Sequence, residues 1–157
     1  MDILLERSFS LCRADDKTNV FLPFQVAKPY QRLIIYWNYE PHLVTDDKIA
    51  AQEIQRCCRR YLPEDKWPDE PIDPKQYEPI FNFVTVSLDS PSGYVGCAHR
   101  HDANMKLILS KTAASPGLEP CPICPGQWRA VLHVHAVIQE PVIGSLRIVG
   151  EDGEELA

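Results

Sequence analysis

The sequence predicts a mainly β fold: a single antiparallel β-sandwich of about seven to nine strands over residues 1–150, with one flanking α-helix. Short stretches in which apolar and polar residues alternate recur along the chain, and turn sequences such as Ser90-Pro-Ser-Gly93 and Ser115-Pro-Gly117 separate them. This is the pattern of short antiparallel strands joined by tight connections. Fourteen prolines among 157 residues also argue against a helical bundle.

Two of the predicted strands are especially clear. Residues 32–39 are apolar on both sides, so this strand should be covered on both faces. In residues 83–89, Val84, Val86 and Leu88 alternate with polar residues, as in a strand with one buried face. The other predicted strands are residues 8–12, 20–26, 94–101, 105–111, 127–138 and 145–149.

Residues 45–62 form the one predicted helix. Thr45 or Asp46 can cap it, and an apolar stripe that includes Ala50 and Ile54 predicts that one helix face packs on a sheet. The adjacent Cys57 and Cys58 are then packing residues of this stripe, since neighbouring cysteines fit disulfide geometry badly.

The next segment, residues 63–79, is rich in proline and acidic residues and is predicted to be an extended surface connection. We expect its Trp67 and Tyr77 to pin the loop to the domain rather than to bind a sugar. Tyr36, Trp37 and Tyr39 raise a similar question, because they could form core, an interface or a stacking platform. We favour core or interface, where large aromatic side chains dominate.

Charge and hydropathy exclude several functions. The net charge is −6, and four acidic residues fall within 151–157, which predicts a flexible acidic tail. Without clustered Lys and Arg we expect no nucleic-acid or anionic-membrane partner. No apolar run approaches the ~18 residues of a membrane span, and the first residues do not form a signal peptide. We therefore expect a cytoplasmic protein whose cysteines are reduced thiols or metal ligands.

A group of potential metal ligands lies between residues 97 and 135. It holds four of the five histidines and three of the six cysteines, in a region of predicted strands. Residues two apart on a strand share a face, and Cys-x-x-Cys is a common zinc-binding spacing. The candidate ligands of a zinc ion are Cys97, His99, His101, Cys121, Cys124, His133 and His135.

Other interpretations of this group stay open. We favour a seam of hydrogen-bonded polar residues in the sandwich, in which histidines satisfy buried groups. A redox or disulfide pair at Cys121 and Cys124 has less support, because reactive pairs usually begin a helix and here a turn and a strand follow. A cysteine nucleophile with His133 as its base lacks an orienting third group.

Several segments, taken in order, resemble the β-sandwich module that precedes the catalytic domain in CehA/McbA-type metallohydrolases of the polymerase and histidinol phosphatase (PHP) superfamily. The resemblance covers roughly residues 21–150 and implies a sandwich fold in which His99 and His135 belong to the framework. The matching segments are Arg32-Leu33, Tyr39-Glu-Pro41, Asn82-Phe-Val-Thr-Val-Ser-Leu-Asp-Ser-Pro-Ser-Gly93, Gly96-Cys-Ala-His-Arg-His101, Ala114-Ser-Pro-Gly117, Pro125-Gly-Gln-Trp128 and His135.

The departures from that family bear on function. The family's PHP barrel follows the sandwich and opens with an Asp-x-His-x-His motif. Here Val131 stands where the Asp would be, and 22 residues follow His135, so we carry over no hydrolase activity. Cys121 and Cys124 stand where the family would have Gly or Pro.

We therefore predict a non-catalytic accessory module that self-associates or binds a protein partner, which could be a PHP-type metallohydrolase acting in trans. The alternatives are a zinc-binding protein that uses the Cys97–His135 group and a small metal-dependent hydrolase.

Overall fold

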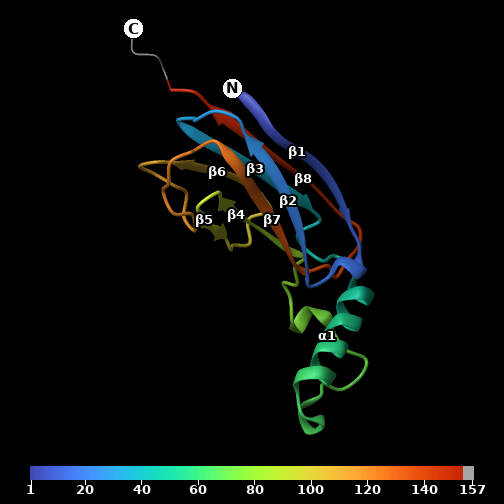
Figure 1. Ribbon diagram of the computed structural model, residues 1–157. Coiled ribbons are helices and arrows are strands. Elements are labelled where there is room, and N and C mark those ends of the chain that lie inside the picture. Colours follow the sequence, from blue (N-terminus) through green and yellow to red (C-terminus); the bar gives the residue numbers. More distant parts are fainter. Residues whose placement is uncertain (154–157) are drawn as a thin grey trace.

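The computed structural model describes residues 1–153, and in them eight strands form two four-stranded antiparallel sheets that pack face to face (Figure 1). The predicted β-sandwich with one helix is therefore confirmed. In the first sheet the strand order is β1 (Asp2–Leu11), β8 (Val142–Glu151), β3 (Arg32–Glu40) and β6 (Asn104–Ser110). In the second it is β2 (Thr18–Val26), β7 (Gly126–Ala136), β4 (Phe83–Ser90) and β5 (Gly93–Ala98).

The prediction missed most of β1, which was expected only from residue 8. Its polar residues, such as Glu6 and Arg7, break the apolar pattern because β1 is an edge strand with an exposed outer side. Pairing with β8 from residue 2 to residue 11 holds this segment in a strand, although its sequence does not alternate clearly.

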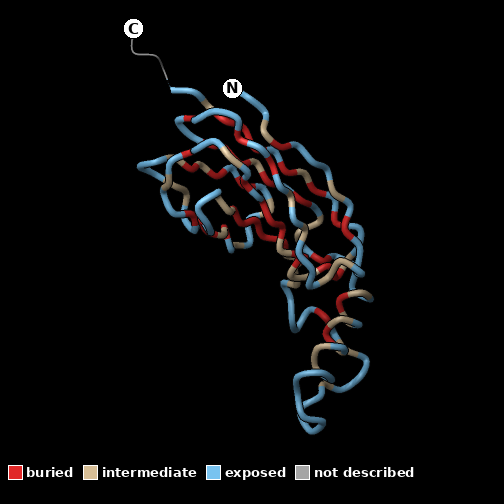
Figure 2. The backbone as a smooth tube through the Cα atoms, viewed as in Figure 1, coloured by how far each residue is buried: buried red, intermediate tan, exposed pale blue. Residues whose placement is uncertain are grey.

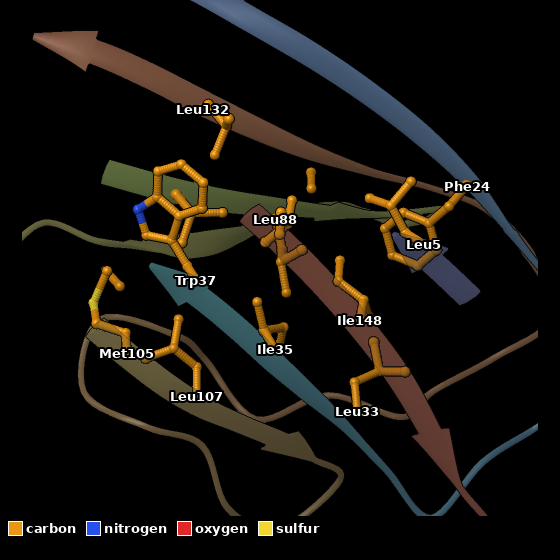
Figure 3. Close-up of a cluster of buried hydrophobic side chains, with 14 of the residues drawn as sticks. Leu5, Phe24, Leu33, Ile35, Trp37, Leu88, Met105, Leu107, Leu132 and Ile148 are labelled. Carbon is orange, nitrogen blue, oxygen red and sulfur yellow. The ribbon is translucent and has the colours of Figure 1, made fainter. Parts of the chain in front are cut away.

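The core lies between the two sheets (Figure 3), and the fully buried Trp37 and Trp128 are its largest side chains. The prediction that β3 is covered on both faces holds only in part: Leu33 faces the core and Ile34 on the outer face is buried, but Asn38 on that same outer face is exposed. The aromatic residues of β3 divide between the faces. Trp37 and Tyr39 belong to the core, whereas Tyr36 is half-exposed on the outer face.

Helix α1 (Asp47–Tyr61) begins where the sequence predicted, with the carboxylate of Asp46 accepting the Ile49 amide at 3.0 Å. The expectation that one helix face packs on a sheet is wrong. Ala50 packs with Val44 and Ile138 at one end of the sandwich, and beyond Ile54 the helix has no buried residue (Figure 2). The apolar stripe is real, but only its first half reaches the sandwich.

Of the predicted acidic tail, only residues 151–153 lie within the described part of the chain. Glu151 still belongs to β8 and forms an ion pair with Arg32, while residues 154–157 lie outside the described residues. Within residues 1–153 no helix is both long and apolar enough to cross a membrane.

Candidate functional site

All five histidines of the chain meet in one connected group of aromatic rings, which we call the histidine cluster. It lies on the outer side of β4 and β7 and extends to the end of the sandwich near α1. The cluster consists of His42, His99, His101, His133 and His135 together with Phe81 and Phe83.

The strand register explains two of these positions. On β7, Leu132 and Val134 face the core, so His133 and His135 face outward beside the outer residues of β4. His133 Nε2 lies 2.8 Å from Ser87 Oγ, and His135 Nε2 lies 2.9 Å from Thr85 Oγ1. The two hydroxyl residues are themselves buried, at 3% and 0% exposure, although they are on the outer face of the sheet. The imidazole rings therefore cover and satisfy buried hydroxyl groups.

The rest of the cluster is held by ring stacking around Phe83. The Phe83 ring stacks on His101 with centroids 4.0 Å apart and on His135 at 4.8 Å, while His99 meets it edge-on at 5.3 Å. Stacked and edge-on pairs are both favourable aromatic arrangements. Phe83 thus joins the β7 histidines to those of the segment that follows β5.

Sequence reasoning missed His42, which lies far from the other histidines in the chain. A bridge between Leu43 and Phe81 brings its segment to the end of the sandwich, where its ring stacks on Phe81 at 4.4 Å. Its Nε2 lies 3.3 Å from Nδ1 of His101. No local pattern around residue 42 signals this long-range pairing.

The buried Asn82 fixes this end of the sandwich. Its side-chain amide donates to the carbonyls of Pro41 at 2.9 Å and Gln139 at 3.0 Å, and its side-chain oxygen accepts the amides of Ile138 at 2.8 Å and Gln139 at 3.1 Å. One fully buried side chain thus ties together the segments on both sides of the helix and the β7–β8 connection.

The electrostatics of the cluster favour neutral rings. Burial lowers the pKa of His133 and of His135, and the nearby His99 lowers both further, although Asp89 opposes the shift at His133. Burial also lowers the pKa of His42, and His101 adds to this effect. At neutral pH these three rings are uncharged hydrogen-bonding groups.

The structure separates the predicted candidate ligands into two places. Cys97, His99, His101, His133 and His135 lie together, with Cys97 Sγ 3.7 Å from Thr85 Oγ1. Cys121 and Cys124 precede β7 at its opposite end, and the seven residue steps from Gly126 to His133 span roughly 23 Å of strand at about 3.3 Å per step.

The loop that carries these two cysteines closes the other end of the sandwich. The Cys121 amide donates to the Ser110 carbonyl at 3.0 Å, the buried Ile123 pairs with Tyr30, and Trp128 Nε1 donates to the Cys124 carbonyl at 3.0 Å. Both thiols are free, and burial together with Cys124 raises the pKa of the Cys121 thiol. A raised pKa disfavours the thiolate that redox chemistry and zinc binding require.

The geometry of the histidines also bears on metal binding. His133 uses both ring nitrogens in contacts, since its Nδ1 lies 3.1 Å from Asn19 Oδ1. Within residues 1–153, no three His, Cys, Asp or Glu side chains are grouped so that they could hold a metal ion. The contacts present are those of a hydrogen-bonded seam, and zinc binding by the seven candidate residues stays a prediction.

A second feature is the segment of residues 45–79, which we call the helical arm. It consists of α1 and a return loop with two short 3₁₀ turns, η2 (Glu64–Lys66) and η3 (Pro74–Gln76), and it projects from the end of the sandwich (Figure 1). The return loop folds back on the helix: Trp67 Nε1 donates to the Leu62 carbonyl at 3.0 Å, and the Arg59 guanidinium lies 5.7 Å from the Trp67 ring centroid.

The arm exposes apolar side chains that the fold does not use. Tyr61 is 66% exposed and Trp67 39%, and Leu62 and Tyr77 are exposed as well. We expected Trp67 and Tyr77 to pin the loop to the domain. Trp67 does hold the loop, but against the arm's own helix, because the helix itself projects away from the sandwich. Tyr77 is 42% exposed.

No family model matches this chain, and no curated protein matches it. The resemblance to the PHP-associated sandwich module thus stays a prediction from the sequence segments given above.

Proposed function

We propose that the protein is a non-catalytic interaction module whose helical arm docks on a protein partner. The observation that carries this proposal is the arm itself. Some thirty-five residues, from 45 to 79, leave the sandwich and return, and only Ala50, Ile54 and Pro74 of its regular elements are buried. The arm therefore adds little to the core of the protein while it exposes apolar side chains. Exposed apolar patches of this kind mark interaction sites.

The chemistry of the tip fits a protein interface. The Arg60 guanidinium lies 5.6 Å from the Tyr61 ring, and Arg59 covers Trp67, so aromatic and arginine side chains alternate there. Tyrosine, tryptophan and arginine are the residues that most often dominate binding energy in interfaces. A partner with an apolar cleft and acidic residues at its rim would complement this tip.

The histidine cluster supports this function by holding the base of the arm. His42 and Phe81 stack where the arm leaves and re-enters the sandwich, and Asn82 is bonded to the chain on both sides. Thr45 and Asp46 are also held, because their amides donate to Gln139 Oε1 at 2.9 and 3.1 Å. A rigid base presents the tip in one orientation and lowers the entropic cost of docking.

The partner is proposed to be a different protein, and the resemblance described above suggests a PHP-type metallohydrolase acting in trans. Self-association is the alternative outcome. Sedimentation of the purified protein distinguishes the two: a monomer at micromolar concentration supports a separate partner, and a dimer that Tyr61→Asp and Trp67→Asp together dissociate supports self-association through the arm.

Co-isolation from cells that produce the protein then tests the arm directly. We expect a partner retained by the wild-type chain to be lost with the Tyr61→Asp/Trp67→Asp variant. It should be retained by Tyr94→Asp, which changes an aromatic residue that is 70% exposed on the sandwich. Equal loss with both variants, or with neither, would contradict docking by the arm.

A further inference from the structure

The outer face of the β1-β8-β3-β6 sheet carries two adjoining hollows that neither the arm nor the histidine cluster touches. Their volumes are about 370 and 530 Å³, and both are lined by Ser8, Asn38 and Ser145, so they form one groove across the strands. Each falls within the range of about 300–1,000 Å³ typical of small-molecule sites. We call this feature the β3 groove.

The strand register builds the groove from two rows of side chains. In one row Ser8, Ser145 and Asn38 lie opposite one another on β1, β8 and β3, and Asn104 follows on β6. In the neighbouring row lie Glu6, Arg147, Tyr36 and Lys106. Short serine side chains beside long ones leave a hollow over the middle of the sheet.

Several hydrogen-bonding side chains in the groove have no hydrogen-bond partner among residues 1–153. Asn38 Nδ2 donates to Ser145 Oγ at 2.9 Å, which orients the amide. The exposed side chains of Glu6, Asn104 and Arg147 make no hydrogen bond to another residue within 1–153, although Glu6 and Arg147 are cross-strand partners. They provide a carboxylate acceptor, an amide that can donate and accept, and a guanidinium donor.

The charges and the aromatic ring together define the ligand class. The acidic and basic side chains among the lining residues are two of each sign, Glu6 and Glu40 against Arg7 and Arg147, so their formal charges cancel and do not select a phosphate or another anion. The half-exposed Tyr36 ring offers a flat apolar surface beside these polar groups, with the flexible Lys106 ammonium 5.8 Å from its centroid. A flat apolar surface edged by both donors and acceptors matches a sugar ring, which has apolar C–H faces and a rim of hydroxyls.

We propose that the β3 groove binds a neutral oligosaccharide. The Tyr36 ring stacks on one sugar, and Asn38, Asn104 and Arg147 bond hydroxyl groups of this sugar and the next along the groove. This site lies on the opposite side of the sandwich from the histidine cluster and does not depend on the helical arm.

The test starts from an array of immobilised neutral oligosaccharides, followed by ¹H–¹⁵N NMR titration of the full chain with the best soluble binder. We expect amide shifts confined to β1, β3, β6 and β8, and at least a tenfold loss of affinity in Tyr36→Ala. Ser8→Trp fills the hollow from an exposed position and keeps Tyr36, so it should cause the same loss without disturbing the core.

The matched control is Tyr94→Ala, which removes an exposed tyrosine from the other sheet and should leave affinity within twofold of wild type. Absence of binding across the array, shifts that map outside the four strands, or undiminished affinity in Ser8→Trp would each overturn the proposal. Preferential binding of acidic glycans would overturn the assignment of a neutral ligand.

Discussion

Replacing Asn82 should lower the free energy of unfolding far more than replacing an exposed asparagine. The side chain is fully buried and uses all four of its hydrogen-bonding positions on backbone groups of residues 41, 138 and 139. In Asn82→Ala these two carbonyls and two amides lose their partners in a site away from bulk water. At a net cost of about 0.5–1.5 kcal/mol per hydrogen bond, and with water entering part of the space, we expect a loss of about 3 kcal/mol.

Urea unfolding followed by the fluorescence of the buried Trp37 and Trp128 measures this loss. The matched control is Asn104→Ala, which removes an exposed asparagine and should change the free energy of unfolding by less than about 0.5 kcal/mol. If Asn82→Ala lies within about 1 kcal/mol of wild type, Asn82 does not clamp the end of the sandwich and the account of the arm's base is wrong.

Three further predictions concern the histidines, a glycine of β5 and the arm. Because the pKa values of His42, His133 and His135 are lowered in the fold, the unfolded chain takes up protons first as the pH falls below about 6.5. The free energy of unfolding should therefore be lower at pH 5.5 than at pH 7.5, and less so in His133→Gln/His135→Gln; equal values at both pH values would refute this. Gly96→Ala should cost at least about 2 kcal/mol, because its φ is +141° and a Cβ would lie 2.1 Å from the Gly117 carbonyl oxygen. Gly93→Ala, with φ +132° but open space around it, should cost clearly less, and similar melting temperatures for the two variants would argue against this close approach. Tyr61→Ser should change the free energy of unfolding by less than about 0.5 kcal/mol, since this side chain is 66% exposed and does not belong to the sandwich core; a loss of several kcal/mol in urea would show that the arm is part of that core.

The sandwich was predictable because its strands alternate clearly. The even spacing of Leu33 and Trp37 places them on one face of β3, which is the core face, and Thr85 and Ser87 mark the polar outer face of β4. The edge strand β1 was mostly missed, because an outer side in water imposes no apolar pattern.

The candidate site was predictable only in part. His133 and His135 follow from alternation along one strand, and their hydrogen bonds to Ser87 and Thr85 match the polar seam favoured from the sequence. His42 and Asn82 depend on a bridge between distant segments, and that kind of contact leaves no local signal. The arm's projection was missed for the opposite reason: an amphipathic stripe shows that a helix has an apolar face but does not show how much of that face is covered.

The most direct test of docking by the arm is site-specific photo-crosslinking in cells that produce the protein. A photoreactive amino acid at position 67 or 61 should give a discrete adduct, whose mass identifies a separate protein or a second copy. The same probe at position 94, an exposed site on the sandwich, should give none. Adducts of equal yield at all three positions, or an adduct at position 94 alone, would contradict an interaction module that works through its helical arm.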